Sequence, residues 1–156
     1  LVHCRSICKK ILSKIGLIDY GMGNIHSVTK AIESLEEEIV LIKNNLQLKD
    51  CKALILPGVG AFDPAINNLS KTGLIIDIKN WIKSGKSFLG ICLGLQLLFE
   101  SSEEGLMKGL GIIEGQIKEI PKLPDQRVPH VGWCKLLPTR KNILLSCQSN
   151  KCFINT

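Results

Sequence analysis

The fold is decided by residues 86–100, which read KSFLGICLGLQLLFE. Residues 87–92 form a short apolar run without an acid or a base, which is typical of a buried parallel strand. From Leu93 to Glu100, apolar residues recur at helical spacing. Cys92 lies between the two, with Gly90 and Gly94 two residues away on either side. This spacing predicts a strand-to-helix turn that carries a cysteine nucleophile.

The paired glycines suit the chemistry of such a turn. The nucleophile takes a strained backbone conformation, and glycines remove side chains that would collide with the neighbouring strand and helix. The amides at the start of the helix point toward the sulfur and favour the thiolate. A buried cysteine at an ordinary turn is the plainer interpretation, since cysteine is often buried. Glycines at both offsets favour the nucleophile.

The composition predicts one domain with an aliphatic core. The 156 residues are 45% hydrophobic but only 4% aromatic, and no apolar run reaches the roughly 18 residues of a membrane span. The net charge is +6, and all but three of the 20 basic residues are lysines scattered along the chain. Without a basic stripe interleaved with aromatics, neither nucleic acid nor a membrane is expected as a partner.

The seven cysteines predict no disulfide framework, because their number is odd and their contexts differ. A reducing compartment, the cytoplasm, fits this usage best, or the plastid stroma for an organellar protein. His3, Cys4 and Cys8 lack a fourth ligand at zinc-finger spacing, so no metal site is predicted. No cofactor is expected either.

The remaining pattern predicts an α/β protein with a doubly wound, mostly parallel sheet. Gly85 is expected to end a helix, and Asp63 to cap one. Residues 110–120 resemble a short hairpin, and no closing strand is expected after residue 138. The expected strands are 14–20, 38–43, 52–56, 87–92 and 130–137, and the expected helical segments are 25–37, 44–50, 66–69, 74–84 and 93–100.

Three segments should meet at the carboxyl edge of this sheet, where ligands bind in doubly wound folds. They are residues 20–24, residues 57–61 and Cys92, each of which follows an expected strand. Glycine-rich turns at 21–23 and 58–60 let the backbone approach a ligand closely. A dinucleotide fingerprint in the first turn is a weak interpretation, because His26 occupies the position of its third glycine.

Several segments resemble the class I, triad-type glutamine amidotransferases. Within that family they are most similar to the glutaminase subunits of imidazole glycerol phosphate synthase, in a cyanobacterial form. The segments are IDYGMGN at 18–24, LPGVGAF at 56–62, GICLGLQ at 90–96, GLGII at 109–113 and PHVGW at 129–133. The resemblance extends from about residue 15 to residue 137 and implies a flavodoxin-like sheet.

This resemblance implies a role in histidine biosynthesis. Cys92 would attack the carboxamide of glutamine, and the Leu93 amide with an amide of Gly58, Val59 or Gly60 would hold the oxyanion. Gln96 and Glu104 match positions that contact glutamine. The ammonia would pass to a TIM-barrel cyclase subunit in a heterodimer, which makes imidazole glycerol phosphate and aminoimidazole carboxamide ribotide. His130 and Trp133 match the face toward that cyclase.

The chain departs from the family pattern in one respect. The triad of the family is completed by a histidine and a glutamate in a His-Pro-Glu segment that these 156 residues do not contain. We therefore interpret residues 14–156 as an amidotransferase domain shortened at its C-terminus, with a core open on one side, and residues 1–13 as an extension outside the family. Two alternatives are an impaired form that only binds the cyclase and another cysteine-elbow enzyme of the same superfamily.

Overall fold

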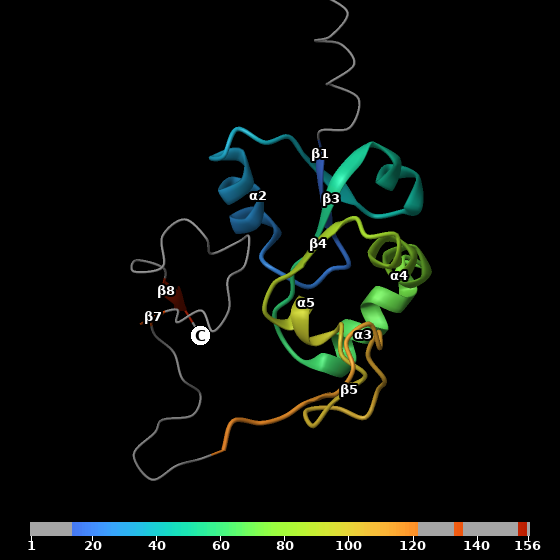
Figure 1. Ribbon diagram of the computed structural model, residues 1–156, viewed down its shortest axis with the longest axis vertical. Coiled ribbons are helices and arrows are strands. Elements are labelled where there is room, and N and C mark those ends of the chain that lie inside the picture. Colours follow the sequence, from blue (N-terminus) through green and yellow to red (C-terminus); the bar gives the residue numbers. More distant parts are fainter. Residues whose placement is uncertain (1–13, 122–132, 136–152, 156) are drawn as a thin grey trace, which may run out of the picture. The chain divides into compact units, whose positions relative to one another are not determined.

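A four-stranded parallel sheet forms the centre of the fold (Figure 1). The computed structural model describes residues 14–121, 133–135 and 153–155, which belong to two compact units divided between residues 119 and 120. In the first unit, the strand order is β2-β1-β3-β4. The strands are β1 (Lys14–Ile18), β2 (Ile39–Ile42), β3 (Cys51–Leu56) and β4 (Ser87–Gly90). The predicted parallel, doubly wound sheet is confirmed.

Helices cover both faces of this sheet (Figure 1). Helix α2 (Ile25–Glu33) lies on one face, whereas α3 (Phe62–Lys71) and α4 (Ile75–Lys83) lie on the other. A 3₁₀ helix, η1 (Asn45–Asp50), leads into β3, and α5 (Leu93–Gln96) follows β4. The predicted helix at 25–37 ends earlier, at Glu33, and Glu36 then takes a positive φ of 58°. Gly85 has φ +75° just after α4, as expected of a residue that ends a helix.

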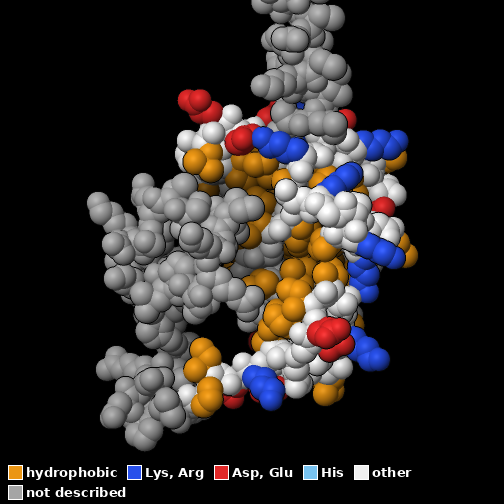
Figure 2. Space-filling model, viewed as in Figure 1, with side chains coloured by type: hydrophobic (Ala, Val, Ile, Leu, Met, Phe, Trp, Pro, Cys, Tyr) orange, Lys and Arg blue, Asp and Glu red, His pale blue; other side chains and the backbone are white. Residues whose placement is uncertain are grey.

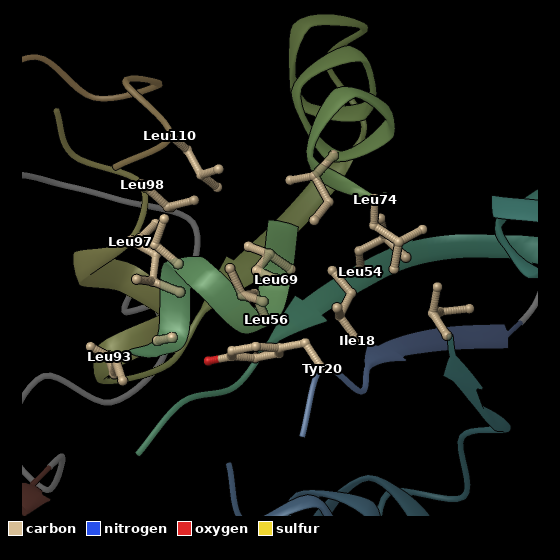
Figure 3. Packing of buried hydrophobic residues seen from close by; sticks show 14 of the residues in the cluster. Ile18, Tyr20, Leu54, Leu56, Leu69, Leu74, Leu93, Leu97, Leu98 and Leu110 are labelled. Carbon is tan, nitrogen blue, oxygen red and sulfur yellow. The ribbon is translucent and has the colours of Figure 1, made fainter. Parts of the chain in front are cut away.

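The core consists of two layers separated by the sheet. Because side chains alternate along a strand, Leu54 and Leu56 of β3 join the larger cluster with α3, α4 and α5, which Figure 3 shows from close by. Ile55, between them, packs with Leu17 and Ile32 beneath α2. Trp81 on α4 is buried, and its indole N–H donates to the Ser87 carbonyl at 3.0 Å, which ties α4 to β4.

The β4 edge of the sheet leaves apolar side chains exposed. Among the described strands, β4 pairs with β3 alone. Leu89, Ile91 and Leu95 are 49%, 37% and 45% exposed. Figure 2 shows apolar side chains near the centre of the view, where Figure 1 places β4 and α5. The described part of the core is therefore open on this side.

The segment after α5 differs from the predicted hairpin. Strands β5 (Ser101–Ser102) and β6 (Gln116–Ile117) pair in parallel, so the hairpin prediction for residues 110–120 was wrong. The amides of Leu110 and Ile112 donate to the carbonyls of Leu97 and Leu98, each at 2.8 Å. Residues 110–112 therefore pair with Leu97 and Leu98, which follow the Cys92 turn (the elbow), and not with a second strand of their own segment.

Asp63 does not cap α3. The helix begins one residue earlier, at Phe62, after Ala61, so the predicted cap was wrong. The Asp63 carboxylate instead accepts hydrogen bonds from the amides of Leu106 and Met107, at 2.9 and 3.0 Å. It thereby joins α3 to the loop after β5.

In the second unit, β7 (Trp133–Lys135) and β8 (Phe153–Asn155) form an antiparallel pair. The predicted strand at 130–137 is confirmed for residues 133–135. The expectation of no closing strand was wrong, because β8 lies close to the C-terminal end of the chain. None of the helices in the part of the chain that the structure describes has the length and hydrophobicity that crossing a bilayer requires.

Candidate active site

Cys92 occupies a strained turn between β4 and α5. It has φ 54° and ψ −119°, and it is one of two non-glycine residues with positive φ in the described part of the chain. Such a conformation costs on the order of 1–3 kcal/mol and persists only where the surrounding structure enforces it. The cysteine is exposed. The predicted strained conformation is confirmed, and the alternative of a buried cysteine at an ordinary turn is wrong.

The two flanking glycines are required by close backbone contacts. A Cβ atom at Gly90 would lie 2.7 Å from the Leu95 Cα and 2.8 Å from its amide nitrogen. A Cβ atom at Gly94 would collide with the carbonyl oxygen of Leu56, the last residue of β3. The elbow is therefore packed directly onto the neighbouring strand, and no other amino acid fits at position 94 without displacement of backbone.

Helix α5 is shorter than predicted, because it ends at Gln96 instead of reaching Glu100. In a longer helix, the carbonyls of Leu97 and Leu98 would accept hydrogen bonds from the next turn. Here they accept bonds from the amides of Leu110 and Ile112. A single turn carries little macrodipole, and the predicted effect of the first helical amides on the thiolate stays a prediction. Within this turn, the backbone amides of Gly94, Leu95 and Gln96 donate to the carbonyls of Ile91 and Cys92, and among the described residues the Leu93 amide donates to no other backbone group.

The segment that follows β3 lies against the start of α5. Pro57 and Gly58 are buried, whereas Val59 is 54% exposed. A Cβ atom at Gly58 would lie 2.7 Å from the Gly94 amide nitrogen and 2.8 Å from the Leu93 Cβ. The structure therefore brings Gly58 and Leu93, two of the four predicted oxyanion residues, into contact.

Gly60 extends away from the elbow toward the first turn. It has φ +99°, a conformation that favours glycine, and a Cβ atom there would lie 3.0 Å from the Met22 Cε. Gly23 has φ +129° and approaches Pro57 in the same way, at 3.2 Å. Asn24 caps α2 by accepting the Ser27 amide at 3.0 Å. The predicted meeting of residues 20–24, 57–61 and Cys92 at one edge is confirmed.

Tyr20 is a residue of this edge for which no role of its own was predicted from the sequence, since it was predicted only as part of the segment 20–24. Its ring is 4% exposed, and its hydroxyl donates to the Pro57 carbonyl at 2.8 Å. Figure 3 shows the ring extending from the end of β1 toward Leu93. The available signal was a lone aromatic hydroxyl directly after a buried strand. Burial, with a smaller contribution from the charge of Cys92, raises the pKa of Tyr20 to about 12.

A titration of Tyr20 tests this environment directly. Tyr20 is the one tyrosine of the chain, so tyrosinate absorbance reports its ionisation alone. We expect a midpoint near pH 12 in the folded protein and near pH 10 in urea. Because the folded state retains the proton more firmly, the free energy of unfolding should fall as the pH rises from 10 to 12. A folded midpoint near 10 would contradict the buried hydrogen bond.

The predicted glutamine-contacting residues lie in two different places. Gln96 is the last residue of α5 and is half-buried. Its backbone amide donates to the Cys92 carbonyl at 3.2 Å. Glu104 is exposed in the turn after β5, where its amide donates to the Ser102 hydroxyl at 3.1 Å. The Asp63 carboxylate accepts hydrogen bonds from the backbone amides of Leu106 and Met107 in the same loop. Asp63 therefore positions the loop that carries Glu104.

For the two predicted interface residues, His130 and Trp133, the structure gives no side-chain environment. His130 lies outside the described residues, and Trp133 is described only as the first residue of β7. In residues 14–121 the one histidine is His26, exposed on α2. The same part of the chain holds no group of three metal-ligating side chains.

The elbow and the sheet match one family. The protein family described as "Glutamine amidotransferase class-I" matches residues 16–153 of the chain, so the chain belongs to the class-I glutamine amidotransferases. A solved structure titled "Crystal structure of glutamine amidotransferase" has the same fold, with a TM-score of 0.60 and 19% sequence identity. That likeness covers 76% of this chain and 61% of the other.

Two relatives narrow the comparison. The chain is 85% identical over 134 residues to "Imidazole glycerol phosphate synthase subunit HisH" of Prochlorococcus marinus subsp. pastoris (strain CCMP1986 / NIES-2087 / MED4). It is 70% identical over 137 residues to the protein of the same name from Prochlorococcus marinus (strain MIT 9312). These alignments cover 86% and 88% of this chain, and 65% and 67% of the two relatives. The chain thus spans about two thirds of their length.

Proposed function

We propose that this chain is the glutaminase part of an imidazole glycerol phosphate synthase and acts in histidine biosynthesis. One observation carries the proposal: a strained, exposed cysteine whose turn is packed against a second amide-bearing segment, at Gly58. Class-I membership and the names of the two Prochlorococcus relatives support the choice of reaction.

The reaction begins at the Cys92 sulfur. The sulfur attacks the carboxamide carbon of glutamine, the C–N bond breaks, and ammonia leaves with the proton that the thiol supplied. Water then hydrolyses the glutamyl thioester to glutamate and restores the thiol. Negative charge develops on the former amide oxygen in both steps, and amides fixed in advance at Leu93 and in the 58–60 segment stabilise it. No cofactor takes part.

The remaining predicted residues serve the substrate and the partner. Gln96 and Glu104 would contact glutamine, and the Asp63 carboxylate keeps the loop of Glu104 in place. Ammonia would pass to a TIM-barrel cyclase subunit in a cytoplasmic heterodimer, with His130 and Trp133 on the shared face. The cyclase would use the ammonia to form imidazole glycerol phosphate and aminoimidazole carboxamide ribotide.

Mixing the purified chain with the cyclase subunit tests this proposal. We expect the two to co-elute in gel filtration and to release glutamate from glutamine. Co-elution without glutamate would instead support a chain that only binds the cyclase. Glutamate without co-elution would point to another cysteine-elbow enzyme of the superfamily. The absence of both co-elution and glutamate would overturn the assignment altogether.

A further inference from the structure

We propose that Tyr20 is a positioning residue for the oxyanion-binding segment at Gly58–Gly60. This inference rests on the proposed glutaminase function and adds a residue to it. Tyr20 makes no covalent contribution to the reaction. Its hydroxyl instead holds one peptide group of the segment in the orientation that the developing charge requires.

The first step in the argument is the hydrogen bond to Pro57. The Tyr20 hydroxyl donates to the Pro57 carbonyl at 2.8 Å, and this bond is buried. A trans peptide is planar, so its carbonyl and its amide hydrogen point in opposite directions. Fixing the Pro57 carbonyl therefore fixes the direction of the Gly58 amide as well.

The second step is the confinement of Gly58. A Cβ atom at this position would lie 2.8 Å from the Tyr20 hydroxyl oxygen, 2.8 Å from the Leu93 Cβ and 2.7 Å from the Gly94 nitrogen. The space next to the Gly58 Cα is thus filled jointly by the Tyr20 hydroxyl and the start of α5. The Tyr20 hydroxyl therefore helps to keep Gly58 packed against Leu93 and Gly94.

The third step is that the far end of the segment is less enclosed than Gly58. Val59 and Gly60 are exposed, and Gly60 adopts a conformation that glycine readily leaves. Tyr20 itself is rigid, because its ring is buried at the end of β1 beside the core. A fixed aromatic side chain therefore anchors the buried base of a segment whose far end is exposed.

The hydroxyl has a specific role that a phenyl ring cannot fill. Tyr20→Phe keeps the ring and its packing but leaves the buried Pro57 carbonyl without this donor. The peptide is then free to rotate toward other donors, and the Gly58 amide rotates with it. We expect weaker oxyanion stabilisation with little change in the reactivity of the sulfur.

Two alkylating probes separate these effects in the full chain. With the chloroketone analogue of glutamine, the Cys92 sulfur first bonds to the ketone carbon, and the electron pair of the C=O bond moves to the oxygen as an oxyanion. The sulfur then bonds to the neighbouring methylene carbon, chloride leaves, the bond to the ketone carbon breaks and the ketone re-forms, which yields a thioether. Iodoacetamide alkylates the same sulfur by direct displacement of iodide and creates no oxyanion. Mass spectrometry of the Cys92 peptide gives both rate constants, and their ratio measures oxyanion stabilisation.

In Tyr20→Phe, we expect the chloroketone rate constant to fall about 10-fold, less than the roughly 10²-fold for loss of an oxyanion donor itself. The iodoacetamide rate constant should stay within about twofold. Thr72→Val is the matched control, because it removes a hydroxyl that donates to the Leu69 carbonyl at 2.6 Å, at the end of α3. Both of its rate constants should equal those of the unchanged chain.

Three outcomes would overturn the inference. An unchanged ratio in Tyr20→Phe, or an equal fall in both rate constants, would show that the hydroxyl has no role or only a structural one. A ratio that falls equally in Thr72→Val would show a general loss of stability. If the unchanged chain reacts no faster with the chloroketone than with iodoacetamide, the proposed glutaminase function itself fails.

Discussion

Cys92→Ser is expected to lower glutamate formation by at least about 10³-fold. Serine keeps the shape of the elbow and the strained backbone, but its hydroxyl is a far weaker nucleophile than a thiolate. Loss of the nucleophile from a catalytic unit removes most of its rate enhancement and leaves what the oxyanion site and binding supply. Glutamate release with the cyclase subunit present measures the effect.

Cys51→Ser is the matched control for this substitution. Cys51 is buried at the start of β3, where its thiol donates to the Gln47 carbonyl at 3.4 Å. Burial raises the pKa of this thiol, so it is a poor nucleophile at neutral pH. Cys51→Ser should retain the glutamate release of the unchanged chain. If Cys92→Ser released glutamate as fast as Cys51→Ser, Cys92 would not be the nucleophile.

Gly94→Ala is expected to destabilise the fold by about 3 kcal/mol or more. Alanine is the better helix former by about 1 kcal/mol, so local preference alone would favour it at this position. The added methyl group, however, collides with the Leu56 carbonyl and crowds the Pro57 backbone. Backbone atoms on both sides must move, and the elbow moves with them. Urea unfolding followed by tryptophan fluorescence measures the loss.

Gly73→Ala separates this collision from the general effect of removing a glycine. Gly73 has φ +71° and nothing within 4 Å of the position of an added Cβ atom. Its replacement should cost only about 1 kcal/mol for the left-handed backbone. If Gly94→Ala and Gly73→Ala show the same midpoint, the close approach of the elbow to β3 is not what requires glycine at position 94.

The parallel sheet could be predicted from the sequence, because its signals are local. Four apolar runs separated by crossovers of sufficient length leave few topologies, and the order β2-β1-β3-β4 is one of them. The strained cysteine was predictable for the same reason, since Gly90 and Gly94 lie within two residues of it. The helical periodicity from Leu93 to Glu100 was misleading, because it reflected burial of Leu97 and Leu98 in the core.

Contacts between distant residues account for most of the errors. Asp63 resembled a helix cap because acids often precede helices, yet it accepts hydrogen bonds from residues 106 and 107, more than 40 positions away. The hairpin predicted at 110–120 failed because its amides bond to the carbonyls after the elbow. No local pattern reveals a partner at such a separation.

The sequence by itself determined the position of the strained cysteine, the strand-to-helix turn and the three segments that converge on one edge. Each follows from the spacing of glycines and apolar residues over short stretches. Only the tertiary structure decided how far α5 extends and that Gly58 touches Leu93. It also decided that the Tyr20 hydroxyl reaches Pro57, 37 residues away. The physical reason is that a hydrogen bond or a close contact depends on positions in space, which the packing of the whole sheet sets.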